Sequence, residues 1–394
     1  MASWKFVNPQ DRSAQRRRQA LLTKIDAWWQ EFAAKTADLE ALFGNRKKWD
    51  LAGWMQRNLQ GIDDRLMWEF GPNHATGATR LVITPESQRA LRPLIETIFE
   101  RAPSLPGWEY LAYRPPESEE VARQMVEARI GVSLPKAVTV RASAGELNRI
   151  DVTFESPGFP RSDKEQAFHQ TFVALESLLG EEVLDKWIGT INVERSKPGR
   201  HSLSLERLKN TVNALIVSSR DQMPRRPLHS EPMPEKWSGV ELKPQPEDDY
   251  VAQSDLLVAV TPFPQILLAS LHDTSFYSER FTRCAEHFAY LKIDSAEETG
   301  PMSPDDRGEI EDELESALRP AGVATVVGGG TGLRYSYIEL ALTDVARTAE
   351  IIRPILRNRK VSKRSWLLFC DCDWHDEWLA IWDDTPAPPR GDEE

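Results

Sequence analysis

The stretch that decides the fold runs from Thr79 to Tyr113, TRLVITPESQRALRPLIETIFERAPSLPGWEYLAY. Its first residues are β-branched and apolar, which is typical of a strand, and Thr84 followed by Pro85 is typical of a helix start. The turn pair Pro106-Gly107 then leads into a second strand that opens with Trp108. A helix is predicted between the two strands, because apolar residues recur three and four positions apart at Leu91, Leu94, Ile95 and Ile98.

The same order of strand, helix and strand occurs twice more, over residues 148–194 and 334–369. The helix of the second copy is expected between Asp163 and Gly180, with Phe168, Phe172, Leu175 and Leu179 on one face. The three copies agree in spacing, because the helix cap precedes the strand-opening tryptophan by 24, 24 and 23 residues, from Thr84 to Trp108, Asp163 to Trp187 and Thr343 to Trp366.

Each copy is preceded by a further helix and strand, so the repeated unit is αββαβ. The helices are expected at about 13–43, 117–130 and 309–319, and the strands at 66–70, 137–141 and 324–327. A weaker fourth copy, without the tryptophan, fits residues 203–293. The alternative is a chance alignment of βαβ pieces, which are common in proteins.

This repetition predicts an α+β protein of tandem ferredoxin-like units, in which helices pack on mainly antiparallel sheets. The units are expected at 1–115, with a long N-terminal helix, and at 116–195. A divergent unit with a Pro-rich loop at 223–237 follows at 196–294, and the last unit, with an acidic lead-in and a Trp-rich C-terminal hairpin, at 295–394.

The charge of the chain disfavours nucleic acid as a partner. Its formal net charge is −12, from 49 Lys and Arg against 61 Asp and Glu, and an acidic surface repels phosphates. Residues 292–318 hold ten acidic side chains and two basic ones, whereas residues 195–227 hold eight basic and two acidic ones. The basic segment is interpreted as a solvated face, and the acidic one as a surface that could mimic nucleic acid.

Targeting signals are not evident in the sequence. The residues from Met1 to Phe6 lack the apolar region of a secretory signal, and no apolar run approaches the roughly 20 residues that cross a bilayer. Three cysteines are too few for a disulfide framework, which suits a reducing compartment. We therefore expect a cytoplasmic protein that does not enter a membrane.

The densest cluster of chemically active residues is Cys370-Asp-Cys-Asp-Trp-His-Asp-Glu-Trp378. One hypothesis is a divalent metal site, because carboxylate and imidazole side chains are common ligands and the cluster supplies Asp371, Asp373, His375 and Glu377. The other interpretation is a polar hairpin that turns near His375, with small buried cysteines and packed tryptophans.

Aromatic residues suggest a second kind of site. Trp28, Trp29 and Phe32 on the N-terminal helix make an apolar surface wider than one helix normally hides, so the helix is either buried on a wide face or binds a protein. Trp374 and Trp378 of the hairpin are further candidate binding residues.

Three short segments resemble stretches seen in uncharacterised bacterial proteins, and the resemblance implies no activity. They are Trp68-Glu-Phe-Gly-Pro72, Leu105-Pro-Gly-Trp-Glu109 and Gly329-Gly-Thr-Gly-Leu-Arg-Tyr-Ser-Tyr-Ile338.

The sequence as a whole favours a non-enzymatic module that binds another protein, as a regulator or an immunity-type inhibitor. A metal-dependent enzyme centred on residues 371–377 and a small-ligand-binding protein remain the alternatives. No cofactor is expected, and the oligomeric state is left open.

Overall fold

The computed structural model describes residues 4–7, 11–73, 76–161, 163–272, 275–295 and 304–390. Helices and three sheets combine in it, which confirms the α+β class. The chain divides into two units. Unit 1 consists of Met1–Ala112, Gly239–Val260 and Phe288–Glu394, and unit 2 of Tyr113–Ser238 and Thr261–His287. Among the described residues, every helix is too short or too polar to cross a membrane.

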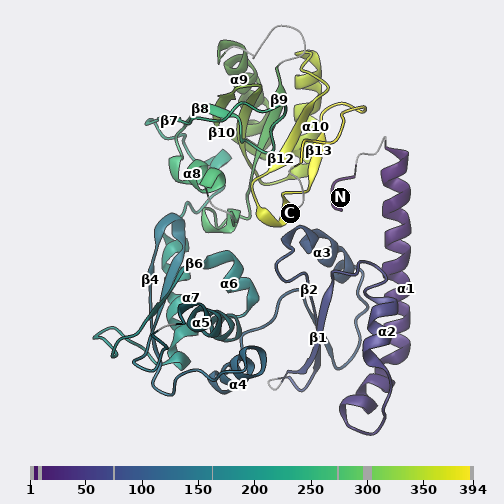
Figure 1. The fold of residues 1–394 in the computed structure, drawn as a ribbon. Helices are drawn as coiled ribbons and strands as arrows, with labels where there is room; N and C mark the ends of the chain where they lie inside the picture. Colours follow the sequence, from purple (N-terminus) through teal and green to yellow (C-terminus); the bar gives the residue numbers. More distant parts are fainter. Residues whose placement is uncertain are drawn as a thin grey trace. The chain divides into compact units, whose positions relative to one another are not determined.

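Unit 2 is built on a three-stranded sheet in the order β4-β5-β6 (Figure 1). β4 pairs antiparallel with β5, and β5 pairs parallel with β6, which leaves β6 at an edge. Helix α5 joins the parallel strands; as predicted, Asp163 caps its start and Gly180 ends it. The elements are α4 (Glu119–Ile130), β4 (Thr139–Ala144), η2 (Glu146–Asn148), β5 (Ile150–Glu155), α5 (Lys164–Leu179), α6 (Glu181–Trp187), β6 (Ile188–Glu194), α7 (Leu205–Asp221), η3 (Leu228–Ser230), α8 (Pro264–His272) and η4 (Ser278–Arg280).

The first part of unit 1 repeats this pattern. Its sheet has the order β1-β2-β3, with an antiparallel and then a parallel pair. The helix expected from Pro85 begins only at Arg92, because the Thr84 hydroxyl accepts a hydrogen bond from the Glu86 N–H in a tight turn. The elements are α1 (Arg12–Phe43), α2 (Leu51–Asn58), β1 (Met67–Pro72), β2 (Thr79–Thr84), η1 (Arg89–Leu91), α3 (Arg92–Glu100) and β3 (Trp108–Leu111).

The second part of unit 1 is a seven-stranded sheet in the order β13-β12-β9-β11-β10-β8-β7. Strands from residues 196–294 and from 295–394 therefore share one sheet, and the division of the chain into four units stays a prediction. The elements are β7 (Ser238–Glu241), β8 (Leu256–Thr261), β9 (His287–Asp294), α9 (Pro304–Ala321), β10 (Ala324–Gly332), β11 (Tyr335–Leu342), α10 (Val345–Asn358), β12 (Ser365–Phe369), η5 (Cys372–Trp374) and β13 (Trp378–Ala380).

The ferredoxin-like arrangement is not confirmed for the repeated units. In the last copy β9 lies between β11 and β12, which is the split βαβ order of a βαββαβ motif. In the first two copies the corresponding strands, β2 with β3 and β5 with β6, pair directly in parallel. The copies thus share an order of elements along the chain but differ in which strands of their sheets pair.

The alternation of side chains gives the seven-stranded sheet two different faces. One face is apolar and packs against α9 and α10, with Leu291 of β9 and Leu340 of β11 among its buried residues. The opposite face carries polar side chains, and the strongest examples are Lys292 of β9 and Tyr335 of β11, both of which are buried. A segment before β8, residues 248–255, contributes the contacts that this polar face makes.

Candidate functional site

The predicted metal cluster forms a hairpin. β12 and β13 pair antiparallel, and the 3-10 turn η5 lies between them. Asp371, Asp373 and Glu377 are buried, whereas His375 is exposed, with its Nε2 3.4 Å from Oδ1 of Asp376. Within the described ranges no three His, Cys, Asp or Glu side chains are grouped so that they could hold a metal ion. A metal centre here stays a prediction.

Glu377 has a structural partner, the segment near the N-terminus. Its Oε1 accepts the N–H of Trp4 at 2.6 Å, and its Oε2 accepts those of Lys5 at 2.9 Å and Phe6 at 3.0 Å. The Phe6 ring stacks on Phe369 at a centroid distance of 5.1 Å. A buried carboxylate that accepts three backbone donors ties this segment to the hairpin.

The aromatic residues singled out on the first helix lie in the core of unit 1. Trp28, Trp29 and Phe32 are buried, and the indole Nε1 of Trp29 donates to the carbonyl of Ile98 at 2.8 Å. Trp374 is buried and Trp378 is half-buried. Burial on a wide face thus describes the first helix, and a binding role for these five residues stays a prediction.

The acidic segment 292–318 is largely neutralised where it is described; residues 296–303 lie outside the described ranges. On α9, arginines pair with four of its carboxylates, as in Glu311 with Arg307 at 2.7 Å, Glu315 with Arg319 at 2.5 Å, and Glu309 and Glu313 with Arg359, each at 2.8 Å. Such pairing leaves this helix less suited to mimic a nucleic acid.

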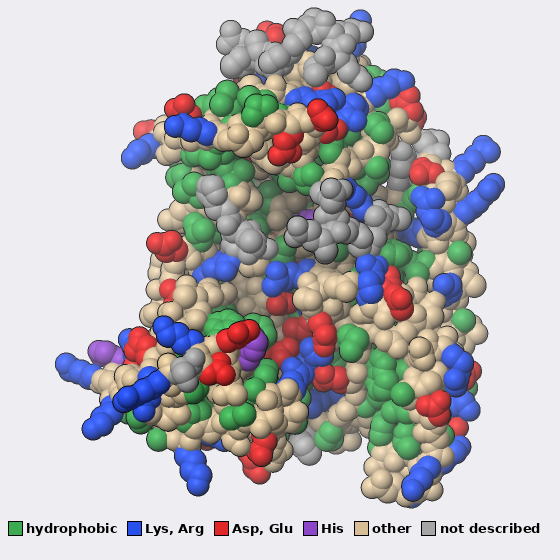
Figure 2. All heavy atoms as spheres, in the orientation of Figure 1, with side chains coloured by type: hydrophobic (Ala, Val, Ile, Leu, Met, Phe, Trp, Pro, Cys, Tyr) green, Lys and Arg blue, Asp and Glu red, His purple; other side chains and the backbone are tan. Residues whose placement is uncertain are grey.

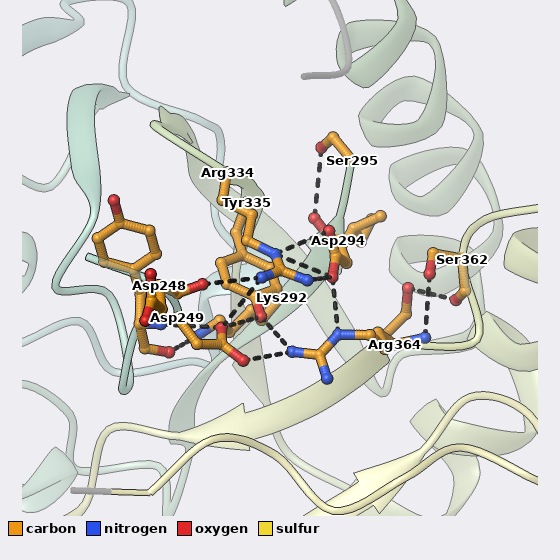
Figure 3. Close-up of polar contacts among 12 residues, drawn as sticks. Asp248, Asp249, Lys292, Asp294, Ser295, Arg334, Tyr335, Ser362 and Arg364 are labelled. Carbon is orange, nitrogen blue, oxygen red and sulfur yellow. Dashed lines mark hydrogen bonds and ion pairs between the residues drawn. The ribbon is translucent and has the colours of Figure 1, made fainter. Parts of the chain in front are cut away.

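A polar network that the sequence did not indicate lies at the end of β9 (Figure 3). Arg334, which precedes β11, and Arg364, which precedes β12, both point at the buried carboxylate of Asp294, and each forms an N···O contact of 2.7 Å. The antiparallel pairing of β9 with β12, in which Ile293 faces Ser365, brings these residues together. We call this network, which also includes Asp249, Asp255, Lys292 and Tyr335, the Asp294 cluster.

Tyr335 links the cluster to the segment that covers it. Its hydroxyl donates to Oδ1 of Asp249 at 2.5 Å and accepts from Nη2 of Arg364 at 2.7 Å. Asp255 accepts the backbone N–H groups of Arg334 at 2.8 Å and Tyr335 at 2.9 Å. Burial and the bond to Asp249 raise the pKa of Tyr335, so the phenol stays protonated.

Lys292 is the fully buried cation of the cluster. Its Nζ lies 4.0 Å from the centre of the Tyr335 ring and donates to the carbonyl of Tyr250. Burial lowers the pKa of Lys292 to about 8, against the opposing pull of Asp255 and Asp249. Three carboxylates face three cations, so the cluster is balanced in charge. Its contacts hold residues 248–255 against the sheet.

A more open feature lies in unit 2, where a groove of about 530 Å³ adjoins β6 and the first half of α5. Three successive residues of β6 line it, Ile191, Asn192 and Val193. Successive side chains of a strand point to opposite faces of a sheet, so a groove that touches all three runs along the free edge of the strand. Its other lining residues are Phe159, Pro160, Arg161, Lys164, Ala167, Phe168 and Arg195.

Two phenylalanines extend the apolar surface beside this groove. Phe168 and Phe172 are 41% and 40% exposed, and their ring centroids are 6.3 Å apart. Of the four residues predicted to share one face of this helix, Leu175 and Leu179 are buried, whereas Phe168 and Phe172 are exposed. The side of α5 that is buried does not include the two phenylalanines; it consists of Ala167, Gln170, Thr171, Val173, Ala174, Leu175, Leu178 and Leu179.

Apolar periodicity does not predict this buried side of α5, because two of its residues are polar. Gln170 is buried because its Nε2 donates to the carbonyl of Ser133 at 2.9 Å, and the Thr171 hydroxyl donates to the carbonyl of Phe168 at 2.9 Å. Once these two positions are counted as buried, the buried side leaves both phenylalanines at its margin.

The charge pattern of the sequence does not indicate the cations of the groove, since only Arg195 belongs to the basic segment 195–227. Figure 2 shows Lys and Arg side chains gathered over protruding loops of unit 2, at the lower left of the view. Comparisons with protein-family models, curated proteins and solved structures find no match to the chain, so the functional interpretation depends on this geometry.

Proposed function

We propose that the protein is a binding module that recognises a segment of another protein in the groove of unit 2. The observation that carries the proposal is the pair of Phe168 and Phe172, each about 40% exposed, beside a groove on the free edge of β6. Two large aromatic side chains that share one exposed helix face, rather than the core, are typical of an interaction surface.

Aromatic residues of this kind supply much of the energy of protein interfaces when a partner covers them. The apolar lining of the groove also includes the buried Phe159 and, from β6, the half-buried Ile191 and Val193. A short segment would therefore meet apolar contacts at the centre and charged groups at the rim, as in known interfaces. A module of this kind acts on its partner as a regulator or an inhibitor.

The test is selection of peptides on the full chain. A phage-displayed library of short random peptides is panned on the immobilised wild type and on the double variant Phe168→Ser/Phe172→Ser. Phe43→Ser is the matched control, because Phe43 is also 40% exposed but lies on α1 of unit 1.

We expect the wild type and the Phe43→Ser variant to enrich a shared set of peptides and the double variant to lose that set. Equal enrichment on all three proteins, with circular dichroism showing that the double variant is folded, would overturn the proposed function.

A further inference from the structure

The edge position and the charge of the groove identify the kind of segment that fits it. We infer that the partner presents an extended acidic segment, which adds to unit 2 as a further strand beside β6. This inference rests on the proposed function, because it names the chemistry of the segment that the module binds.

Strand addition follows from the topology of the sheet. β6 pairs with β5 on one side, and in the described part of the chain no strand pairs with it on the other. A free strand edge presents a row of backbone N–H and C=O groups, which an extended peptide can satisfy. Since Ile191, Asn192 and Val193 all line the groove, this edge is accessible where the groove runs.

The charge of the lining gives the sign of the segment. Arg161, Lys164 and Arg195 line the groove, and none of the three forms an ion pair with a described residue. Arg195 is held in place through Nε, which donates to the carbonyl of Phe159 at 2.9 Å and leaves the Nη groups for a ligand. Three carboxylates adjoin these cations in the sequence: Asp163 caps α5, Glu194 pairs with Arg141, and Glu165 does not line the groove.

The same charges argue against a second copy of this chain as the occupant. Two copies that paired through their β6 edges would bring two sets of three cations together, and like charges at close range are repulsive. An acidic segment would be attracted by all three cations. Because side chains alternate between the two sides of an extended chain, its apolar residues can face Phe159 and Phe168 while its carboxylates face the charged rim.

The experiment measures fluorescence anisotropy of labelled peptides of about ten residues, a length that spans the edge of a strand. One probe alternates valine and glutamate, the second alternates valine and lysine, and the third is the glutamate peptide with alternate backbone nitrogens methylated. All three are titrated with the full wild-type chain.

Two triple variants of the chain test the charges. Arg161→Glu/Lys164→Glu/Arg195→Glu reverses the groove, and Arg207→Glu/Lys209→Glu/Arg225→Glu makes the same change in net charge elsewhere in unit 2. These control residues are exposed and do not line the groove.

We expect the glutamate peptide to bind the wild type at least about tenfold more tightly than the lysine peptide. The groove reversal should invert that order, the control triple should preserve it, and backbone methylation should weaken binding by about tenfold or more because strand bonds are lost.

Each contrary outcome has a distinct meaning. If both peptides bind equally and Phe168→Ser/Phe172→Ser abolishes binding, the acidic inference is overturned while the proposed function stands. If methylation has no effect, strand addition is overturned. If the chain alone sediments as a dimer that the groove reversal dissociates, the occupant is a second copy, which also overturns the inference. If neither peptide binds and panning is insensitive to the two phenylalanines, the proposed function itself fails.

Discussion

The ammonium nitrogen of Lys292 lies 4.0 Å from the centre of the Tyr335 ring, and the lysine side chain is buried. The two residues lie on the polar face of the seven-stranded sheet, under the segment that holds Asp249 and Asp255. A cation in this position gains from the ring and from the carboxylates but loses its hydration. Because the loss is larger, the pKa of Lys292 is lowered to about 8.

The first prediction concerns the stability of the chain between pH 8 and 10. In this range the folded protein releases the proton of Lys292, whereas the unfolded chain keeps it up to its ordinary pKa of 10.5. The unfolded state binds more protons, so Lys292 makes the free energy of unfolding rise with pH, by up to about 1.4 kcal/mol per unit.

The Lys292→Met variant should lack this rise, and the control Lys243→Met, which changes an exposed lysine, should keep it. Urea unfolding of the three proteins at pH 7, 8, 9 and 10 makes the comparison. Parallel curves for the wild type and Lys292→Met would contradict the prediction.

The second prediction concerns Glu339, which lies on the same sheet face and accepts a hydrogen bond from Gln253. Burial raises the pKa of Glu339 to about 7, and the bond from Gln253 only partly opposes it. Between pH 4.5 and 7 the folded state holds the extra proton, so this residue makes stability fall as pH rises.

Glu339→Gln should therefore be more stable than the wild type at pH 8, by about 2–3 kcal/mol, and equal to it below pH 4.5. Chemical denaturation at both pH values tests this, with the exposed Glu350→Gln as the control. A Glu339→Gln variant no more stable than the wild type at pH 8 would rule out an ionised, desolvated carboxylate at this position.

The third prediction concerns Glu377, which accepts the N–H groups of Trp4, Lys5 and Phe6. Removing the carboxylate leaves these donors without their acceptor, so Glu377→Ala should destabilise the chain by at least about 2 kcal/mol. Hydrogen exchange at the amides of residues 4–6 should accelerate in the same variant. Asp376→Ala, next to it but paired with exposed His375, should change neither quantity.

A chelator separates this role from the predicted metal site at residues 371–377. If Glu377 acts through the backbone amides alone, EDTA leaves the melting temperature of the wild type unchanged. A fall in melting temperature with EDTA that Asp373→Ala abolishes would establish a metal site instead.

The fourth prediction compares the two sides of α5. Phe168→Ser and Phe172→Ser should each change the free energy of unfolding by less than about 1 kcal/mol, because both side chains are 40% exposed or more. Leu175→Ala, on the buried side, should cost about 2–5 kcal/mol. Thermal unfolding of single variants tests this, and a large loss for either phenylalanine would place it in the core.

Much of the fold could be predicted from local signals. Asp163 caps α5 as predicted, α10 is capped by Asp344 rather than by the neighbouring Thr343 used for the spacing, and strands form from Thr79, Tyr335 and close to Trp366. The pairing of the strands could not be predicted. The local sequence pattern of a βαβ connection does not differ between two strands that pair directly and two strands that have a third strand between them. The insertion of β9 between β11 and β12 depends on packing from distant parts of the chain.

The candidate sites were harder to predict, for a physical reason in each case. In β9 the alternation of Tyr290, Lys292 and Asp294 with apolar residues signals a polar face, and ordinarily such a face is solvated. Only the fold reveals that residues 248–255 cover it. On α5, the burial of Gln170 and Thr171 depends on hydrogen bonds to backbone carbonyls, which apolar periodicity does not register.

The interleaving of the two units has a consequence for the order of events as the chain is synthesised. Most of unit 2 is one continuous segment, residues 113–238, whereas unit 1 needs three separate segments. In the seven-stranded sheet, β8 pairs with β10, where Val260 faces Gly329, and β9 pairs with β12, where Ile293 faces Ser365. Both partner strands are synthesised later than the strands with which they pair. The groove of unit 2 can therefore form while the chain is still growing. The seven-stranded sheet can be completed only after its last strands have been synthesised, and until then its unpaired strands are exposed to aggregation.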